Sequence, residues 1–192
     1  MTRKLSLTLI LLISLISAPV ALAFDEMSNE DAATLLKKHE MFAATHTIKL
    51  VTGTVQAKLS DVERYQPNYA GLRSIGLVDL TSVTIESADK DPKKRHDWTS
   101  VSLTEKGLKE SSTWTKESDN EWIVTIAVRQ LVEVIKIHKD SEERIHGIEF
   151  TWTWAPNKIG EGLKFTYPPE RAYAKLERDG KDWRIVSIRV IG

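Results

Sequence analysis

Residues 148–154, IEFTWTW, carry the clearest structural signal in this sequence. Large apolar side chains occupy every second position of this stretch and polar ones lie between them; the apolar set is Ile148, Phe150, Trp152 and Trp154. A repeat of two residues is that of a β-strand with one apolar and one polar face. Strands of this kind belong to antiparallel sheets, so we predict such a sheet here, with the tryptophan side in the core.

The sequence on both sides of this stretch continues the sheet. Before it, residues 122–138 follow one long strand pattern whose apolar residues share one parity: Trp122, Val124, Ile126, Val128, Val132 and Val134. A straight strand of this length would reach roughly 55 Å, so we expect a bend near residues 129–130. After it, residues 172–176 alternate again, and the turn dipeptide Asp-Gly at residues 179–180 leads into a returning strand over residues 183–191.

The part of the chain ahead of the sheet begins with helical signals. Ser28 is a capping residue followed by acidic residues, and apolar residues recur after it at helical spacing, so we predict a helix over residues 29–44. Residues 46–59 alternate instead, with a change of parity near Gly53 that indicates a bulge or a turn. A helix and an extended segment are therefore expected first.

A second run of short elements follows. Ser60 opens the spacing of a capping box and Gly76 suits a left-handed stop, so we predict a short helix between them. The next patterns are a strand over residues 78–86, a polar loop over residues 87–97, a strand over residues 98–103 and a short helix over residues 105–110. This order predicts a helix joined to a hairpin.

Residues 69–108 carry three motifs in a recognisable order. Tyr69 and Leu72 are followed by Gly-Leu-Val at residues 76–78, and Val-Ser-Leu-Thr-Glu-Lys-Gly occupies residues 101–107. The order resembles the winged-helix domains of bacterial transcription regulators, in which a recognition helix ends in a Gly-Leu-Val step and a two-stranded wing precedes a Leu-Thr-x-x-Gly turn. We therefore expect a winged-helix-like hairpin in this half of the chain.

The resemblance implies DNA contacts that the charges of this segment oppose. Carried over, the contacts would come from Arg73 on the helix and from Lys93, Lys94 and Arg95 at the wing tip. Residues 61–116 contain nine basic and nine acidic side chains, so the attraction to phosphate nearly cancels. We expect no nucleic-acid partner and interpret the segment as a packing unit or a protein-contact module.

The C-terminal half carries a second, less specific resemblance. A helix ahead of a curved antiparallel sheet, with Ala-x-Ala-x-Leu at residues 172–176 and Asp-Gly-Lys-Asp-Trp-Arg-Ile at residues 179–185, is similar to cystatin-type and nuclear-transport-factor-like folds. Members of those families range from catalysts to pure binders, so no functional residue carries over. The whole also resembles small exported bacterial proteins without an assigned activity. The predicted fold class is α+β: short N-terminal helices with a winged-helix-like hairpin, then a C-terminal antiparallel β-meander.

The first 23 residues have the order of a secretory signal. Two basic residues precede the apolar run over residues 5–16, and Ala21-Leu22-Ala23 supplies the small residues of a signal-peptidase site. We expect cleavage between Ala23 and Phe24. The alternative, an uncleaved anchor, is disfavoured because the apolar run is short for a hydrocarbon core of about 30 Å.

The mature chain is then expected to be one domain, residues 24–192, with a winged-helix-like half (24–118) and a sheet half (119–192). It contains no cysteine, which excludes a lipid-modified cysteine at the cut, thiolate catalysis and cysteine metal sites. We expect a location in the bacterial periplasm or outside the cell, and no transmembrane segment after cleavage.

Sequence motifs of known catalytic chemistry are missing. His39-Glu40 lacks the second histidine of a zinc-protease helix, because Ala43 stands at that position. Residues 71–76 are one residue too long for the nucleophile elbow of a hydrolase. We therefore predict no catalytic residue, no metal site and no cofactor.

Two arrangements nevertheless leave a catalytic alternative open. His138 and His146 flank a turn that carries Asp140, Glu142 and Glu143, a set that would suit a cation as well as a solvated hairpin tip. Three glutamates lie on strands that would be neighbours in a sheet: Glu133, Glu149 and Glu177. A pair of them would serve glycoside hydrolysis at the right separation, although outward charges on a sheet face explain them too.

The segment over residues 155–169 follows neither a helix pattern nor a strand pattern. A long irregular loop is a common place for binding, and the tryptophan side of the preceding strand would be a platform for sugar rings or a peptide if it faced solvent. The candidate binding residues are Trp152, Trp154, Asn157, Lys164, Phe165 and Tyr167.

Taken together, these patterns predict an exported, non-catalytic binding or interaction module. The expected partner is another envelope protein or an envelope polymer. The alternatives are an envelope hydrolase that uses carboxylate or histidine residues and, against the leader sequence, a winged-helix DNA-binding protein.

Overall fold

The computed structural model describes residues 26–85, 96–142 and 144–191. The expected signal peptide, with its cleavage point between Ala23 and Phe24, and the expected wing tip over residues 93–95 lie outside the described residues. None of the helices within the described ranges has the length and apolar character that crossing a membrane requires.

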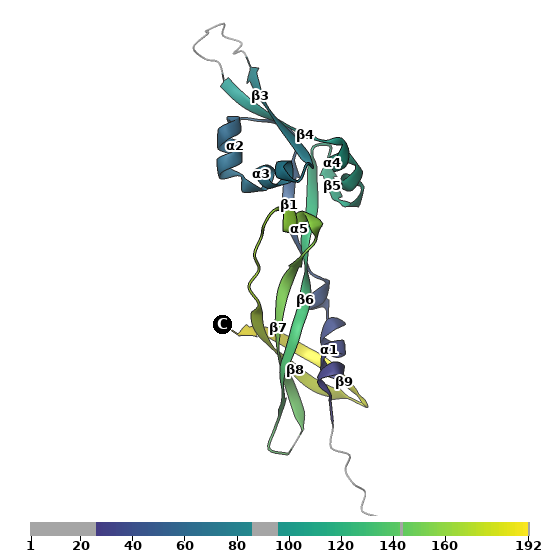
Figure 1. Ribbon diagram of the computed structural model, residues 1–192. Helices are drawn as coiled ribbons and strands as arrows, with labels where there is room; N and C mark the ends of the chain where they lie inside the picture. The colour runs from purple at the N-terminus through teal and green to yellow at the C-terminus, as the bar shows by residue number, and fades with distance from the viewer. Residues whose placement is uncertain (1–25, 86–95, 143, 192) are drawn as a thin grey trace, which may run out of the picture.

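The chain folds as an α+β protein with helices mostly towards its N-terminus and an antiparallel meander at its C-terminus (Figure 1), which confirms the predicted fold class. The helices are α1 (Asn29–Lys37), η1 (Glu40–Ala43), α2 (Leu59–Tyr65), α3 (Pro67–Ser74), α4 (Glu105–Glu110), η3 (Ser111–Thr113) and α5 (Lys158–Gly162). The strands are β1 (Thr45–Val51), β2 (Gly53–Val55), β3 (Val78–Ile85), β4 (His96–Leu103), β5 (Thr115–Ser118), β6 (Glu121–Lys139), β7 (Ile145–Pro156), β8 (Glu170–Asp179) and β9 (Asp182–Ile191).

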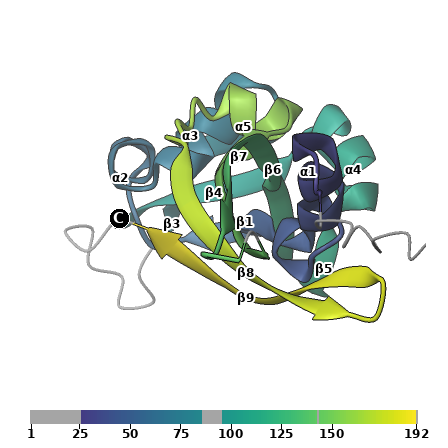
Figure 2. The same cartoon turned by 90° about the horizontal axis from the view of Figure 1, so that it is seen from below.

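The main sheet runs through the length of the molecule. Within the described residues it has six strands in the order β1-β6-β7-β8-β9, with β5 also paired to β6, and every pair is antiparallel. The 19-residue strand β6 is its spine (Figure 1). Seen from the end, β8 and β9 form one margin of the sheet (Figure 2), and α1 contacts both β6 and β9. We call the face that packs against α1 the concave face and the other the outer face.

A smaller sheet lies at the other end of the molecule. Its strand order is β2-β4-β3, and α2, α3 and α4 pack around it (Figure 1). Tyr69 on α3 joins this unit to the main sheet, because its hydroxyl donates to the carbonyl of Val51 at 3.0 Å. Burial of the ring raises the pKa of the Tyr69 hydroxyl. The buried hydroxyl of Thr99 likewise donates to the carbonyl of Ala57.

Apolar side chains form two cores. The upper core lies beneath α2 and α3 and includes Val62, Leu72, Leu80, Val101 and Ile126. The lower core lies inside the curl of the main sheet, where α1 contributes Ala32 and Leu36 and β7 contributes Ile148, Phe150 and Trp152. With Trp152 only 3% exposed, the prediction that the tryptophan side of residues 148–154 faces the core is confirmed for that residue.

The first predicted helix is shorter than its pattern. It starts after Ser28, whose hydroxyl accepts from the N–H of Asp31 in a capping box, as the sequence indicates. However, it ends at Lys37 rather than near residue 44. The ring nitrogen Nδ1 of His39 accepts from the N–H of Met41 and starts η1 as a separate turn. A local side-chain cap therefore interrupts the helical period.

The second predicted helix is divided as well. Over residues 60–76 the chain forms α2 and α3, which meet at Gln66, because Pro67 has no N–H to continue a helix and fits the first turn of a new one. The capping box expected at Ser60 is absent, since Lys58 is the N-cap of α2. The stop at Gly76 and the break at Gly53 are confirmed by their positive φ angles of 73° and 102°.

Strand β6 is continuous from Glu121 to Lys139 and carries bulges on both sides of residues 129–130, where the sequence predicts a bend. Ile126 is skipped in the register with β1, and Val132 and Ile135 are skipped in the register with β7. Each extra residue reverses which side chains face inward. The single parity predicted for this strand is therefore wrong: Leu131 is buried, Val132 is exposed, and Arg129 lies on the concave face.

Candidate functional site

Aromatic side chains gather at one end of the concave face. We refer to this set as the aromatic cluster: His46, Trp152, Trp154, Phe165 and Tyr167. His46 comes from β1, the tryptophans from β7, and the other two from the chain between α5 and β8. Strand register brings them together. Strands β1 and β7 are both paired with β6, one on each side, and side chains of paired residues lie on the same face of the sheet.

His46 is the centre of the cluster. Its ring centroid lies 5.4 Å from that of Trp154 and 5.5 Å from that of Tyr167, both edge-on. Trp152 and Trp154 are 5.8 Å apart, also edge-on, while Phe165 stacks on Tyr167 at 6.0 Å. These are the separations and angles that aromatic pairs prefer. The cluster is graded in depth, because Trp152 is buried, Trp154, His46 and Tyr167 are partly buried, and Phe165 is 36% exposed.

Arg129 lies over both indoles. It is paired with Trp154 across β6 and β7, and its guanidinium carbon is 4.5 Å from the ring centroid of Trp152 and 4.9 Å from that of Trp154. Its Nη1 donates to the carbonyl of Met41 in η1 at 3.3 Å. The two cation–π contacts and this hydrogen bond hold the guanidinium in place.

Some polar atoms in and beside the cluster are enclosed without a partner among the described residues. They are Nε of Arg129, Nε1 of Trp152 and the hydroxyl of Tyr167. Burial raises the pKa of the Tyr167 hydroxyl. Enclosed polar groups without hydrogen bonds are unusual in proteins.

The segment over residues 155–169 is anchored by its own first residues. Asn157 caps α5: its side-chain oxygen accepts from the N–H groups of Ile159 and Gly160, and its amide nitrogen donates to the carbonyl of Thr125. A Cβ at Gly160 would lie 2.2 Å from the carbonyl oxygen of Ile126, so α5 sits directly on β6. Asn157 therefore has a structural task.

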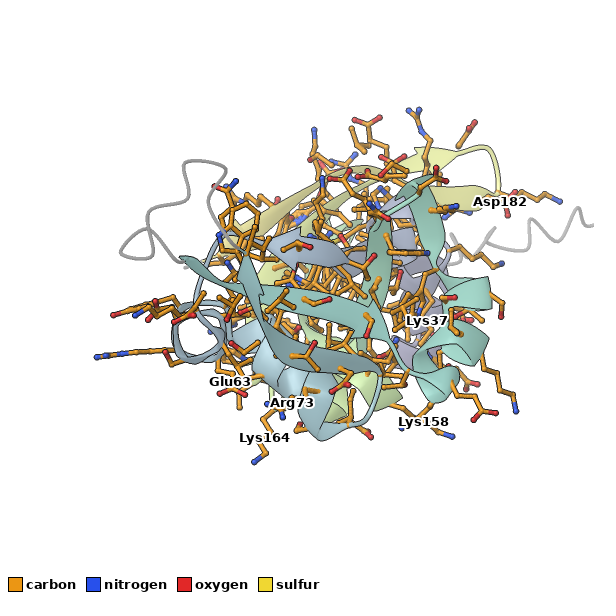
Figure 3. All side chains as sticks on the ribbon, turned by 90° about the horizontal axis from the view of Figure 1, so that it is seen from above. Lys37, Glu63, Arg73, Lys158, Lys164 and Asp182 are labelled. Carbon is orange, nitrogen blue, oxygen red and sulfur yellow. The ribbon has the colours of Figure 1, made fainter. Side chains whose placement is uncertain are left out.

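The rest of the segment covers the cluster. The hydroxyl of Thr153 donates to the carbonyl of Tyr167 at 2.9 Å, which fixes the chain beside β7. Lys164 has a positive φ of 56°, and its exposed side chain projects outward from the surface of the molecule (Figure 3). Of the candidate residues predicted from the sequence, Trp152, Trp154, Phe165 and Tyr167 come together, whereas Asn157 and Lys164 do not join them.

A cavity of about 640 Å³ opens next to the cluster. Residues 39–41 line it on the side of η1, Arg129 contributes from β6, and residues 186–188 with Val190 line it on the side of β9. A second cavity, of about 390 Å³, lies between α1 and the β8–β9 turn and includes Asp31, Lys38 and Trp183. Both cavities are therefore next to the helical segment that packs inside the sheet.

The outer face carries a different, polar group. Nε2 of His138 on β6 donates to Glu149 on β7 at 3.1 Å, and Arg171 on β8 forms an ion pair with the same carboxylate. The hydrogen bond from His138 and the charge of Arg171 lower the pKa of Glu149, whose side chain is 13% exposed. The carboxylate is therefore held ionised and paired.

His138 and His146 are close to each other, but the structure does not build a cation site from them. Their ring centroids are 6.0 Å apart, and the tip residue Asp140 accepts from the side chain of Arg144 and from backbone N–H groups. These bonds lower the pKa of Asp140, and the largest contribution comes from the backbone N–H of Arg144. Glu143 lies outside the described residues. Among those that are described, no group of three or more His, Asp or Glu side chains is arranged for a metal ion.

The remaining glutamates are spread along the sheet. Glu149 is paired with Tyr173, and Glu177 stands four residues further along β8, or about 13 Å at strand spacing. This separation exceeds what either class of glycosidase uses. Glu177 is instead in an ion pair with Arg184, and Glu133 lies opposite Thr151.

The helix residue that the winged-helix resemblance would place on DNA is engaged in an ion pair. Arg73 on α3 forms an ion pair with Glu63 on α2, and the two side chains meet on the surface (Figure 3). Lys93, Lys94 and Arg95 lie outside the described residues.

Sequence reasoning missed His46 and Arg129. His46 lies some eighty positions from its pairing partner Ala127 and about a hundred from the rings it contacts, so no local pattern connects them. Arg129 stands at an odd position, whereas the apolar residues predicted to face inward stand at even ones, and the skipped residue Ile126 turns it inward. A bulge leaves no reliable mark in a sequence that is apolar on both sides of it.

Comparison of the chain with protein-family models, with curated proteins and with solved structures found no match.

Proposed function

We propose that this protein is an exported, non-catalytic binding module whose binding surface is the aromatic cluster together with residues 155–169. The observation that carries the proposal is the graded depth of the cluster: Phe165 and Trp154 reach the surface, while Trp152 lies in the core beneath them. Rings held by core contacts offer a large contact area with little loss of conformational freedom on binding. Aromatic side chains and arginine are also where binding energy concentrates in interfaces.

The partner in this proposal is another envelope protein or an envelope polymer. The support is the leader pattern of the first 23 residues, which is that of a signal peptide cleaved between Ala23 and Phe24. Export would place the mature chain in the periplasm or outside the cell, where proteins and glycan polymers both offer surfaces that stack on aromatic rings.

The winged-helix-like half, residues 24–118, serves in this proposal for packing or protein contact. The ion pair between Arg73 and Glu63 and the equal numbers of basic and acidic residues over 61–116 both weaken attraction to a phosphate backbone. A gel shift at low salt is the direct check, and binding there would favour the DNA-binding alternative instead.

The proposed surface is tested by capture from envelope extract. The mature chain is immobilised beside two variants, Phe165→Ala in the cluster and Leu108→Ala on α4, because Leu108 is also apolar and exposed but is not part of the cluster. We expect the same partner on the wild type and on Leu108→Ala at micromolar concentration, and at least about a tenfold loss for Phe165→Ala. No partner at that concentration, or equal capture by both variants, would contradict the proposal.

A second candidate function, an envelope hydrolase, rests on the contact between His138 and Glu149. A carboxylate that orients a histidine is the usual partner of a general base. Because Arg171 keeps Glu149 ionised, Glu149 would orient His138 rather than donate a proton. Turnover in a panel of ester, amide and glycoside substrates that disappears in His138→Ala would establish this function in place of the first.

A further inference from the structure

The cavity between η1 and β9 has two chemically different walls. On one side lies the guanidinium of Arg129, and on the other the aliphatic side chains of Val186, Ile188 and Val190. Its volume of about 640 Å³ is within the range of small-molecule sites. None of these residues belongs to the aromatic cluster or to residues 155–169, although Arg129 stacks on Trp152 and Trp154, so the cavity adjoins the proposed binding surface without being part of it.

Arg129 is a cation without an anion among the described residues. Arg73, Arg144 and Arg171 each form an ion pair with a carboxylate, but Arg129 forms none within that part of the chain. Its one hydrogen bond goes from Nη1 to a backbone carbonyl, and Nε is enclosed without an acceptor. A guanidinium held between rings and partly removed from water has lost hydration that only an acceptor can replace.

The opposite wall leaves aliphatic surface in water. Val186 is 43% exposed and Val190 is 56% exposed, although Ile188, which lies between them on β9, packs against the lower core. Exposed apolar side chains that line a cavity favour a ligand that covers them. Removing their apolar surface from water stabilises the complex.

The remaining lining groups narrow the class of ligand. The exposed carboxylate of Glu40 also lines the cavity, so a ligand with several negative charges would be repelled. His39 accepts through Nδ1 from the N–H of Met41, which leaves the proton on Nε2 as a further donor. A single negative charge placed at Arg129, away from Glu40, is the arrangement that these groups accept.

We infer that this cavity binds a linear aliphatic monocarboxylate, with the carboxylate on Arg129 and the chain along Val186, Ile188 and Val190. Arg129 anchors the head group through the N–H donors that Met41 does not occupy, and the strand β9 provides the aliphatic contact. The inference goes beyond the proposed function, because it concerns another opening and holds whether or not a partner binds the aromatic cluster.

The test is a titration of the mature protein with dodecanoate below its micellar concentration, followed by tryptophan fluorescence and calorimetry. Trp152 and Trp154 lie against Arg129 and so report on its surroundings. Dodecyltrimethylammonium has a similar chain and the opposite charge, acetate has the carboxylate without the chain, and dodecyl phosphate has a second negative charge. We expect saturable binding of dodecanoate, and at least about tenfold weaker binding of the other three.

Variants assign the binding to the two walls. Arg129→Met keeps the length of the side chain and removes the charge, and Val190→Asp places a charge on the exposed aliphatic wall. Each is expected to weaken dodecanoate binding about tenfold or more. Arg184→Met is the matched control for the loss of charge. Arg184 is on β9, the strand of the aliphatic wall, but it forms an ion pair with Glu177 and does not line the cavity. This variant should bind dodecanoate like the wild type.

The outcomes separate cleanly. Should Arg129→Met fail to fold, as judged by its unfolding curve, Val190→Asp and the cationic amphiphile decide the matter alone. No saturable binding of dodecanoate, equal binding of the cationic amphiphile, or wild-type affinity in every folded variant would overturn the inference. Because Phe165 does not line this cavity, failure here leaves the capture experiment on the aromatic cluster unaffected.

Discussion

The two faces of strands β6, β7 and β8 differ in whether their charged side chains are paired with opposite charges. On the outer face, Glu149 is matched by His138 and Arg171, so three charged or polar groups satisfy one another. On the concave face, Arg129 is surrounded by indole rings and a backbone carbonyl, and it has no carboxylate in ion-pair contact within the described residues.

The two faces differ in what a new hydrogen-bond partner would gain there. A group whose donors and acceptors are already paired gains little from a new contact, because an existing bond must first be broken. A guanidinium with unused donors beside a cavity gains from any acceptor that reaches it. This contrast is the reason why both binding proposals concern the concave face.

The largest effect is expected from the concave face. Trp152→Ala removes a buried indole that packs against Trp154, Arg129 and the lower core, and should lower the free energy of unfolding by about 3–5 kcal/mol. The measurement is urea denaturation followed by far-UV circular dichroism. Phe165→Ala, in the same cluster but 36% exposed, is the control and should lose about 1 kcal/mol or less. Similar losses in both variants would show that Trp152 contributes no more to stability than the exposed ring of Phe165.

A smaller effect is expected on the outer face at Gly147. The ring of Tyr173 covers this glycine, and a Cβ there would lie 2.0 Å from the tyrosine oxygen. Gly147→Ala should therefore displace the ring and cost about 1–3 kcal/mol in urea denaturation. In a Tyr173→Ala background the same substitution has no ring to displace and should cost nothing. A loss that persists without the tyrosine would place its cause in the backbone.

The smallest effect is the pH dependence of the outer face. His138 and Arg171 lower the pKa of Glu149 below its ordinary value, so the unfolded chain takes up a proton at higher pH than the folded one. This stabilisation is complete above pH 4.5, the ordinary value, and is lost as the pH falls through the lower folded pKa. Because Arg171 is largely exposed, solvent screens the pair.

Glu149→Gln isolates that contribution. Urea midpoints measured from about pH 7 down to about pH 3 should fall less steeply for the variant than for the wild type. Asp31 and Asp140, whose pKa values are also lowered, are present in both proteins and cancel in the difference. Parallel curves would mean that the outer-face carboxylate is not held by its neighbours, and the contrast between the two faces would disappear.

Local patterns predicted much of the fold. The alternation over residues 148–154 correctly assigned Ile148, Phe150 and Trp152 to one buried face of a strand, and Asp-Gly at residues 179–180 correctly marked the β8–β9 hairpin. These features depend on the period of the chain itself and on turn geometry, which nearby residues determine. The division of the first helices by His39 and Pro67 was local too, but the helical period of the apolar residues obscured it.

The candidate site was predictable only in part. The aromatic residues of β7 and of the following segment are close in sequence and were identified together. His46 and Arg129 were not, because the first depends on pairing across β6 and the second on a bulge at Ile126. Long-range pairing is decided by which apolar surfaces can be buried together, and that is a property of the whole sheet.

The class of this protein follows from local sequence patterns: an antiparallel meander with short helices ahead of it, built around an apolar strand face that has to be buried. Three features emerge from the tertiary structure alone: β6 changes its inward face at each bulge, α1 packs inside the curl of the sheet, and Arg129 lines a cavity on the concave face. The physical reason is that periodicity is encoded residue by residue, whereas the partner of a charge is set by which strand lies next to it.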